Sequence, residues 1–234
     1  MTNWIEQALT DAASLIEWLR KQEKADSVLS TISRRIADTL TSGGRVLTCG
    51  NGGSMCDAMH FAEELSGRYR QDRAAFAAQA MGDPAHMSCV ANDFGFERVF
   101  ARGVEAWGKP GDLLMVFSTS GSSPNIVAAA RSARERQMTV VGLLGRDGGE
   151  VRALCDLSLV VPAQTSDRIQ EVHEKTLHLL IEGVERILVP GHYGAECAED
   201  FHHRGSGVSG SQPMMRTFCG DPIAGTGARF KSNA

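Results

Sequence analysis

His60 and Glu64 are the first pair of side chains in the sequence that could act together on a ligand. They lie four residues apart in a stretch that reads as a helix, so both should project from the same face. An imidazole and a carboxylate placed in this way can bind a metal ion or serve as an acid–base pair. Such a pair more often forms a simple surface hydrogen bond, so its meaning depends on where the helix begins. Glu63 lies about 100° round the helix from Glu64 and is expected to be structural.

The helix follows a glycine-rich turn, GNGGS at 50–54, which comes directly after a short apolar run, RVLTC at 45–49. Backbone N–H groups at a helix start have no partner inside the helix and favour an anion. The turn lacks the Lys-Ser/Thr of a P-loop, and Met55 stands where a dinucleotide fingerprint has its last glycine. A tight turn with Ser54 as the helix cap explains this stretch equally well.

A second loop, FSTSGSSPN at 117–125, favours ligand binding more strongly. It follows the apolar run DLLMVFS at 112–118 and opens a helix with Pro124 in its first turn. A single glycine is surrounded by the hydroxyls of Ser118, Thr119, Ser120, Ser122 and Ser123. Hydroxyls beside free backbone amides suit a phosphate monoester, whereas the alternative is a solvated serine-rich loop. Loops at the carboxyl ends of parallel strands can face one crevice, so the two loops are expected to form one site.

Short apolar runs alternate with helical segments from Gly44 onward, which is typical of a parallel sheet covered by helices on both faces. Strands are predicted at 45–49, 74–81, 112–118, 138–145 and 157–162. Helices are expected between and after them, at 54–67, 84–92, 96–107, 123–136, 147–154 and 168–189. We therefore predict an α/β fold, a three-layer sandwich with a five-stranded parallel sheet, as one domain over residues 1–189.

Two amphipathic helices precede the first strand, at about 3–20 and 26–40, and their segment (1–42) is included in the domain. The first helix has a wide apolar stripe that contains Trp4 and Trp18. The stripes could pack on the chain's own sheet or on another subunit, and the sequence leaves both possibilities open.

Residues 190–234 differ from the rest in composition. After Pro190 the chain has no leucine, and its only branched aliphatic residues are Val208 and Ile223. Such a segment cannot bury enough apolar surface to offset its ordering entropy, so we expect a disordered tail.

The bulk composition excludes several classes of protein. The net charge of −4 gives no overall attraction to nucleic acid or anionic membrane. No stretch reaches the roughly 18 uninterrupted apolar residues of a membrane span, and the acidic, amphipathic N-terminus is not a targeting peptide. The six cysteines form no CxxC pair. We interpret them as reduced thiols, mostly with packing roles, in a cytoplasmic protein.

The last predicted helix adds Gln170 and His178, which are eight residues apart. The rise between them is about 12 Å, so one straight helix cannot place both on the same ion. Either Gln170 precedes the regular helix or different subunits supply the two residues. His178 lies among leucines and is expected to be largely buried, whereas Glu171 and His173 are expected on the outer face.

Four separated motifs carry a family resemblance: CGNGGSMCDAMHFAEELSGRY (49–69), ANDFGFE (91–97), FSTSGSSPN (117–125) and SDRIQEVHEKTLH (166–178). Together they resemble the phosphoheptose isomerases, a family within the sugar isomerase (SIS) domain group. The resemblance runs from the N-terminal helices to about Leu188 and leaves the tail outside. It implies a Rossmann-like SIS domain and a cytoplasmic homotetramer, with active sites and the N-terminal helices at subunit interfaces. It also implies conversion of D-sedoheptulose 7-phosphate to D-glycero-D-manno-heptose 7-phosphate, the first step towards nucleotide-activated heptose for the lipopolysaccharide core.

The resemblance further implies roles for the matching residues. One Zn²⁺ per subunit would be bound by His60, Glu64, Gln170 and His178, with Glu64 and His178 as the acid–base pair. Substrate-binding positions would be Asn51, Gly52, Gly53, Glu64, Asn92, Asp93, Ser118, Thr119, Ser120, Ser123 and Gln170. A non-catalytic SIS protein is the alternative, either replication-initiator-associating or sugar-phosphate-sensing. The first of these lacks the equivalents of Glu64 and His178 and the second does not need the His–Glu pair, so their presence favours an enzyme.

Overall fold

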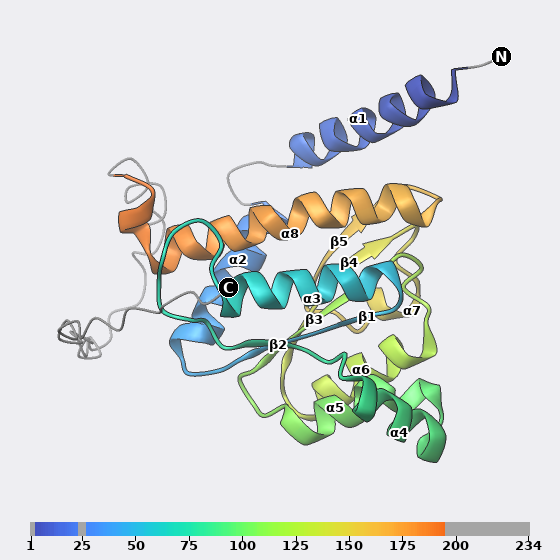
Figure 1. Cartoon of the computed structure of the whole chain (residues 1–234), viewed down its shortest axis with the longest axis vertical. Coiled ribbons are helices and arrows are strands. Elements are labelled where there is room, and N and C mark those ends of the chain that lie inside the picture. Colours follow the sequence, from blue (N-terminus) through green and yellow to red (C-terminus); the bar gives the residue numbers. More distant parts are fainter. Residues whose placement is uncertain (1–2, 23–26, 195–234) are drawn as a thin grey trace, which may run out of the picture.

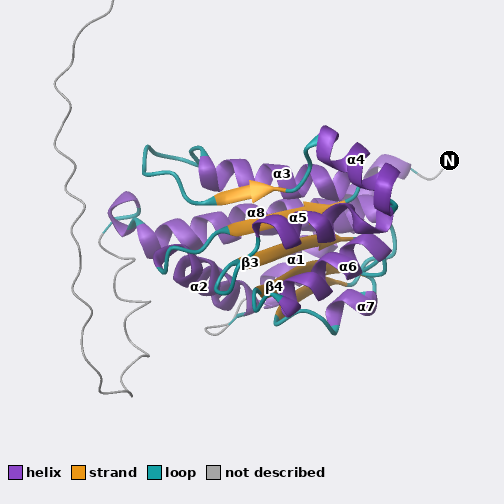
Figure 2. Cartoon of the chain, turned by 90° about the horizontal axis from the view of Figure 1, so that it is seen from below, coloured by secondary structure: helices purple, strands orange, loops and turns teal. Residues whose placement is uncertain are grey.

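The computed structural model describes residues 3–22 and 27–194, and its centre is a single five-stranded parallel sheet (Figure 1). The strand order is β2-β1-β3-β4-β5. The strands are β1 (Val46–Gly50), β2 (Ala78–Ala80), β3 (Leu113–Ser118), β4 (Thr139–Gly145) and β5 (Leu157–Val161). Figure 2 shows the sheet between two layers of helices. The predicted α/β sandwich is confirmed.

The helices divide between the two faces of the sheet. One face is covered by α2 (Val28–Thr41), α3 (Gly53–Ser66) and α8 (Ser166–Leu188). The other is covered by α4 (Pro84–Phe94), α5 (Val99–Trp107), α6 (Pro124–Glu135) and the short α7 (Gly149–Arg152). Along β3, Leu113 packs toward the first layer and Leu114 toward the second. Since both faces of the strand are buried, its sequence is apolar throughout.

The order of the strands reverses beside β1, which lies between β2 and β3. A reversal of this kind leaves a crevice outside the carboxyl ends of the two strands, where open α/β sheets bind ligands. Gly50 at the end of β1 pairs with Phe117 near the end of β3. The glycine-rich turn and the serine-rich loop therefore leave the sheet next to each other, as predicted.

The two N-terminal helices behave differently. In α2, Ile32 and Ile36 are fully buried in the core that α8 also lines. In α1 (Trp4–Gln22), which lies above α8 in Figure 1, Leu19 is the only buried residue. Its exposed apolar residues include Trp4, at 75% exposure, and Leu9, at 66%. Within the described chain, α2 therefore packs on its own sheet, while the apolar stripe of α1 remains largely uncovered.

Several element boundaries differ from the sequence-based expectation. The edge strand β2 has three residues rather than eight. Gly95, with φ of 87°, separates α4 from a 3-10 turn at Phe96–Arg98, so α5 begins later than expected. Helix α3 begins at Gly53 with Gly52 as its cap, so the assignment of Ser54 as the cap was wrong. Of the expected tail, residues 195–234 lie outside the described residues.

Two expectations from composition can also be compared with the structure. Cys49 is buried and Cys155 is partly buried, which suits a packing role, whereas Cys56 and Cys89 are exposed. Cys197 and Cys219 lie outside the described residues. Among the described residues, no helix has both the length and the apolar character required to cross a membrane.

Candidate functional site

A pair of asparagines joins the two loops at the crevice. The Asn51 amide nitrogen donates to Oδ1 of Asn125 at 2.9 Å, and the Asn125 amide nitrogen donates to Oδ1 of Asn51 at 2.8 Å. Asn125 is 3% exposed and lies in the first turn of α6. This reciprocal pair fixes the turn after β1 against the loop after β3, and Asn125 is a residue that the sequence analysis did not select.

The serine-rich loop is tightly shaped around Gly121. Ser118 Oγ accepts a hydrogen bond from the Gly121 N–H at 3.0 Å. Gly121 has φ of 63°, and a Cβ there would lie 1.9 Å from the carbonyl oxygen of Gly148. Thr119 Oγ1 lies 3.1 Å from Ser166 Oγ, and Ser123 precedes α6 without a side-chain capping bond. The predicted hydroxyl cluster is thus present at the amino end of α6, where anions are favoured.

Gln170 lies beside the glycine-rich turn. A Cβ on Gly53 would be 2.6 Å from the Gln170 amide nitrogen, so only glycine leaves room for this side chain. The same nitrogen has a long contact, 3.5 Å, with Ser54 Oγ. Gln170 lies within α8, so the possibility that it precedes the regular helix was wrong. The eight-residue separation from His178 therefore remains within one chain.

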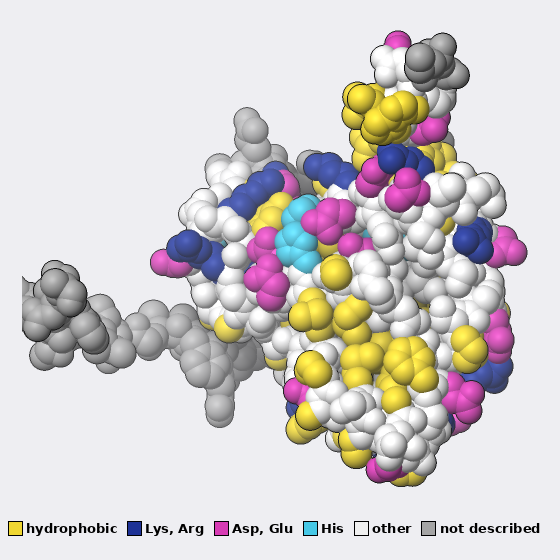
Figure 3. Space-filling model, turned by 45° about the vertical axis from the view of Figure 1, so that its right-hand side comes forward, with side chains coloured by type: hydrophobic (Ala, Val, Ile, Leu, Met, Phe, Trp, Pro, Cys, Tyr) yellow, Lys and Arg dark blue, Asp and Glu magenta, His cyan; other side chains and the backbone are white. Residues whose placement is uncertain are grey.

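His60 is at the centre of a second group of residues, contributed by α3 and α8. Its Nε2 lies 3.3 Å from Oε1 of Glu64, which confirms that the two share a helix face. Its Nδ1 lies 2.8 Å from Oε1 of Glu174. The rings of His60 and His178 are 4.9 Å apart and nearly perpendicular. Figure 3 shows histidine surface here with acidic side chains next to it. Glu63, on the exposed side, is 3.9 Å from His60 Nε2.

Glu174 and Asp57 are site residues that the sequence analysis missed. Glu174 could have been found, since Gln170, Glu174 and His178 follow at intervals of four and share a face of α8. Asp57 is 7% exposed, and its Oδ2 has no hydrogen-bond partner among the described residues. Burial, reinforced by the nearby Glu174 carboxylate, raises the pKa of Asp57 to about 7. This part of the site therefore carries an excess of carboxyl groups around His60.

The expected orientations of two histidines on α8 were wrong. His173 is fully buried rather than on the outer face, and its Nε2 donates to the Leu144 carbonyl oxygen at 3.1 Å. His178 is only partly buried, and its ring stacks on Tyr69 with the centroids 6.1 Å apart. The physical reason is that α8 turns His173 toward the sheet and His178 toward α3. His178 is thereby accessible to a ligand.

Asn92 and Asp93 lie at the end of α4, away from the His60 group in the sheet's other helical layer. Both are exposed, and the Asn92 amide donates to Oδ1 of Asp93 at 2.7 Å. No hydrogen bond within the described chain connects them to the other candidate residues, so a role for them remains a prediction.

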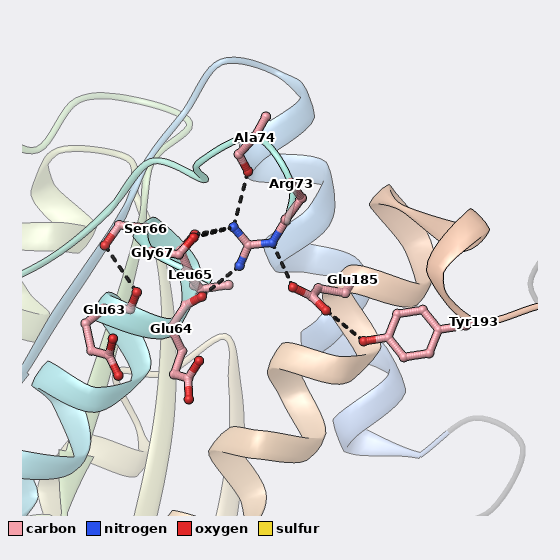
Figure 4. Close-up of polar contacts among 9 residues, drawn as sticks. All are labelled: Glu63, Glu64, Leu65, Ser66, Gly67, Arg73, Ala74, Glu185 and Tyr193. Carbon is pink, nitrogen blue, oxygen red and sulfur yellow. Dashed lines mark hydrogen bonds and ion pairs between the residues drawn. The ribbon is translucent and has the colours of Figure 1, made fainter. Parts of the chain in front are cut away.

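A buried ion pair fixes the ends of α3 and α8 together (Figure 4). Arg73 Nε lies 2.7 Å from Oε1 of Glu185, and both side chains are at most 1% exposed. The Arg73 guanidinium also donates to the carbonyl oxygens of Glu64 and Leu65, at 2.7 and 2.9 Å. Tyr193 OH donates to the second Glu185 oxygen at 2.7 Å. This arrangement holds the last turn of α3, which carries Glu64, at a fixed position on α8.

The residues around His60 fit a divalent transition metal. Ligand atoms of His60, Glu174 and His178 lie within 4.8 Å of one another, and so do those of His60, Glu63 and Glu64. Imidazole and carboxylate groups are suitable ligands for Zn²⁺. Charge also favours a cation, because several carboxylates surround one imidazole. Of the four expected ligands, His60, Glu64 and His178 belong to this region, whereas Gln170 lies beside the glycine-rich turn at the start of α3.

The fold, a five-stranded parallel sheet between two layers of helices, is that of a sugar isomerase (SIS) domain. Residues 9–145 match the family model described as the SIS domain. The chain is 45% identical over 194 residues to a phosphoheptose isomerase of Fusobacterium nucleatum, covering 83% of this chain and 100% of that one. It is 48% identical over 183 residues to a phosphoheptose isomerase of Aeromonas hydrophila, covering 78% and 95%.

Solved structures agree with these sequence matches. A phosphoheptose isomerase from Neisseria gonorrhoeae superposes with a TM-score of 0.70 at 35% identity, covering 78% of this chain and 99% of that one. One from Francisella tularensis gives a TM-score of 0.73 at 31% identity, covering 80% and 100%. The chain belongs to the phosphoheptose isomerase family within the SIS domain group.

Proposed function

We propose that this protein converts D-sedoheptulose 7-phosphate to D-glycero-D-manno-heptose 7-phosphate, the first step towards nucleotide-activated heptose for the lipopolysaccharide core. The observation that carries the proposal is the His60–Glu64 pair beside His178, on helices that start at the crevice. A SIS protein that only binds sugar phosphate, or that associates with another protein, has no need of this pair. Family membership and an intact acid–base pair together favour catalysis.

Isomerisation moves a proton between C1 and C2 through an enediol. Glu64 would remove one proton and His178 would handle the other, as base and acid in turn. The hydroxyls of Ser118, Thr119, Ser120 and Ser123 would hold the phosphate, fixing the reacting carbons in register. The remaining substrate contacts would come from Asn51, Gly52, Gly53, Asn92, Asp93 and Gln170.

One Zn²⁺ per subunit is part of the proposal, bound by His60, Glu64, Gln170 and His178. When bound, zinc would polarise the oxygens on C1 and C2 of the sugar. The chain's own residues support a cation here, since the carboxylates of Glu64 and Glu174 face opposite nitrogens of one imidazole. Because Gln170 is separated from His178 along α8, we propose that a neighbouring subunit completes the ligand set.

A homotetramer in the cytoplasm, with active sites at subunit interfaces, completes the proposal. The uncovered apolar residues of α1 support it, since exposed apolar patches mark interaction surfaces. Further exposed apolar side chains are Met59 on α3, Phe94 at the end of α4 and Phe96 in the 3-10 turn that follows. Figure 3 shows hydrophobic surface extending from the region of the histidines. The mass in solution, measured by light scattering, should be four times that of one chain.

The direct test is turnover of sedoheptulose 7-phosphate by the purified protein. Glu64→Gln should still bind the sugar phosphate but lose turnover, because the amide cannot act as a base. Full activity in Glu64→Gln would exclude the assigned role, and binding without turnover in the unmodified protein would favour the non-catalytic alternative. Exhaustive chelation should also abolish turnover, and adding Zn²⁺ back should restore it. Unchanged activity in protein shown to be metal-free would remove zinc from the proposal.

A further inference from the structure

The two ring nitrogens of His60 have different neighbours at different distances. Nδ1 lies 2.8 Å from Oε1 of Glu174, while Nε2 lies 3.3 Å from Oε1 of Glu64. A neutral imidazole has one N–H donor and one lone pair. The shorter distance is that of a hydrogen bond between a ring N–H and a carboxylate oxygen. For a neutral ring, the shorter distance favours the tautomer with the proton on Nδ1 and the lone pair on Nε2.

A lone pair facing a carboxylate is unfavourable unless a positive charge lies between them. Nitrogen and oxygen ligands lie about 2.0 to 2.1 Å from Zn²⁺, so two ligands of one tetrahedral ion are about 3.3 Å apart. The separation of His60 Nε2 and Glu64 Oε1, 3.3 Å, agrees with two ligands of one ion. The separation of Nδ1 and Glu174, 2.8 Å, is too short for this and agrees with a hydrogen bond.

We propose that Glu174 is a positioning residue: its carboxylate accepts the Nδ1–H of His60 and thereby holds Nε2 toward Glu64 to receive the metal. A carboxylate that accepts the second N–H of a ligating histidine fixes the tautomer and the ring orientation, and raises the basicity of the ligating nitrogen. The inference rests on the proposed metal site, and it assigns to Glu174 a role outside the four expected ligands.

The position of Glu174 in the fold suits this role. It lies on the face of α8 that also carries Gln170 and His178, so the helix backbone sets its distance from α3. The ion pair between Arg73 and Glu185 further along fixes the same two helices. Glu63 also lies near His60, but at 3.9 Å and with a 67% exposed side chain, so it cannot orient the ring in this way.

The test compares Glu174→Ala, Glu174→Gln and a control, Glu171→Ala, with the unmodified full-length protein. Glu171 lies on the same helix but is exposed and pairs with Arg168 at 2.8 Å. Zn²⁺ affinity of each metal-free protein is measured by competition with a chelating indicator. The absorption spectrum of each protein saturated with Co²⁺ reports the ligands and their geometry.

Glu174→Ala should bind Zn²⁺ roughly 10- to 100-fold more weakly, as is typical for loss of such a carboxylate. Glu174→Gln should lose less Zn²⁺ affinity, because its amide oxygen still accepts the Nδ1–H of His60. The Zn²⁺ affinity of Glu171→Ala should be that of the unmodified protein. All Co²⁺ spectra should coincide at saturation.

Equal Zn²⁺ affinity in Glu174→Ala and Glu171→Ala would overturn the inference, while leaving the metal site intact. A Co²⁺ spectrum of Glu174→Ala that shows one ligand fewer than the unmodified protein would also overturn it, by making Glu174 a ligand. Unmodified protein that binds neither ion would refute the proposed metal site and this inference together, whereas the turnover assay judges the isomerase activity separately.

Discussion

Removing either partner of the buried Arg73–Glu185 ion pair should strongly destabilise the protein. In Arg73→Met, the Glu185 carboxylate keeps only the hydrogen bond from Tyr193, and the carbonyl oxygens of Glu64 and Leu65 lose the hydrogen bonds that the guanidinium donates. Both charged side chains are at most 1% exposed, so water cannot take the place of the lost group. Breaking a buried pair typically costs about 3–5 kcal/mol. For a chain of this size, this corresponds to a fall in melting temperature of roughly 6–20 °C.

The measurement is urea unfolding followed by circular dichroism, at one fixed protein concentration because the proposed subunit association would contribute to stability. Glu185→Leu should lower the free energy of unfolding by about as much as Arg73→Met does. The double variant should lose less unfolding free energy than the two single variants together, because the second substitution removes the charge that the first leaves unpaired. These three values give the coupling energy between the two side chains.

The matched control is Arg68→Met in the same connecting segment. Arg68 pairs with Asp72 at 2.9 Å, but the two side chains are 64% and 92% exposed. Exposed ion pairs contribute about 0–1 kcal/mol to stability, so the unfolding free energy of this variant should be close to that of the unmodified protein. If Arg73→Met were no less stable than Arg68→Met, the argument from burial would be refuted.

Two further predictions concern pH and the joined loops. Burial lowers the pKa of His173 from 6.5 to about 4. Between these pH values the unfolded chain binds a proton that the folded protein does not, so stability falls as the pH drops from about 6.5 to 4. The glutamine of His173→Gln still donates to the Leu144 carbonyl but does not titrate. Its unfolding free energy should therefore change less between about pH 6.5 and pH 4, by up to about 3 kcal/mol. Equal pH dependence of the unfolding free energy in the two proteins would contradict this. Asn125→Ala leaves the Asn51 amide without its two hydrogen bonds, so kcat/KM for sedoheptulose 7-phosphate should fall about tenfold, equivalent to about 1.4 kcal/mol. Unchanged kcat/KM would show that the asparagine pair does not position the glycine-rich turn.

The sequence by itself determined the features that depend on local spacing. Continuous apolar runs alternating with helical periodicity indicated the parallel sheet, and the loops after 45–49 and 112–118 were correctly placed at its carboxyl edge. The spacing of four between His60 and Glu64 was enough to put them in contact. These inferences succeed because the period of a helix or a strand fixes which residues share a face.

Only the tertiary structure decided which faces meet. The contact of His60 with Glu174 joins residues 114 positions apart, and that of Arg73 with Glu185 joins residues 112 apart. The inward turn of His173 and the outward turn of His178 depend on how α8 is rotated against the sheet. Periodicity gives the relative angles of side chains about a helix axis, but not the rotation of that axis. That rotation is set by packing of the whole apolar face, which involves segments distant in the sequence.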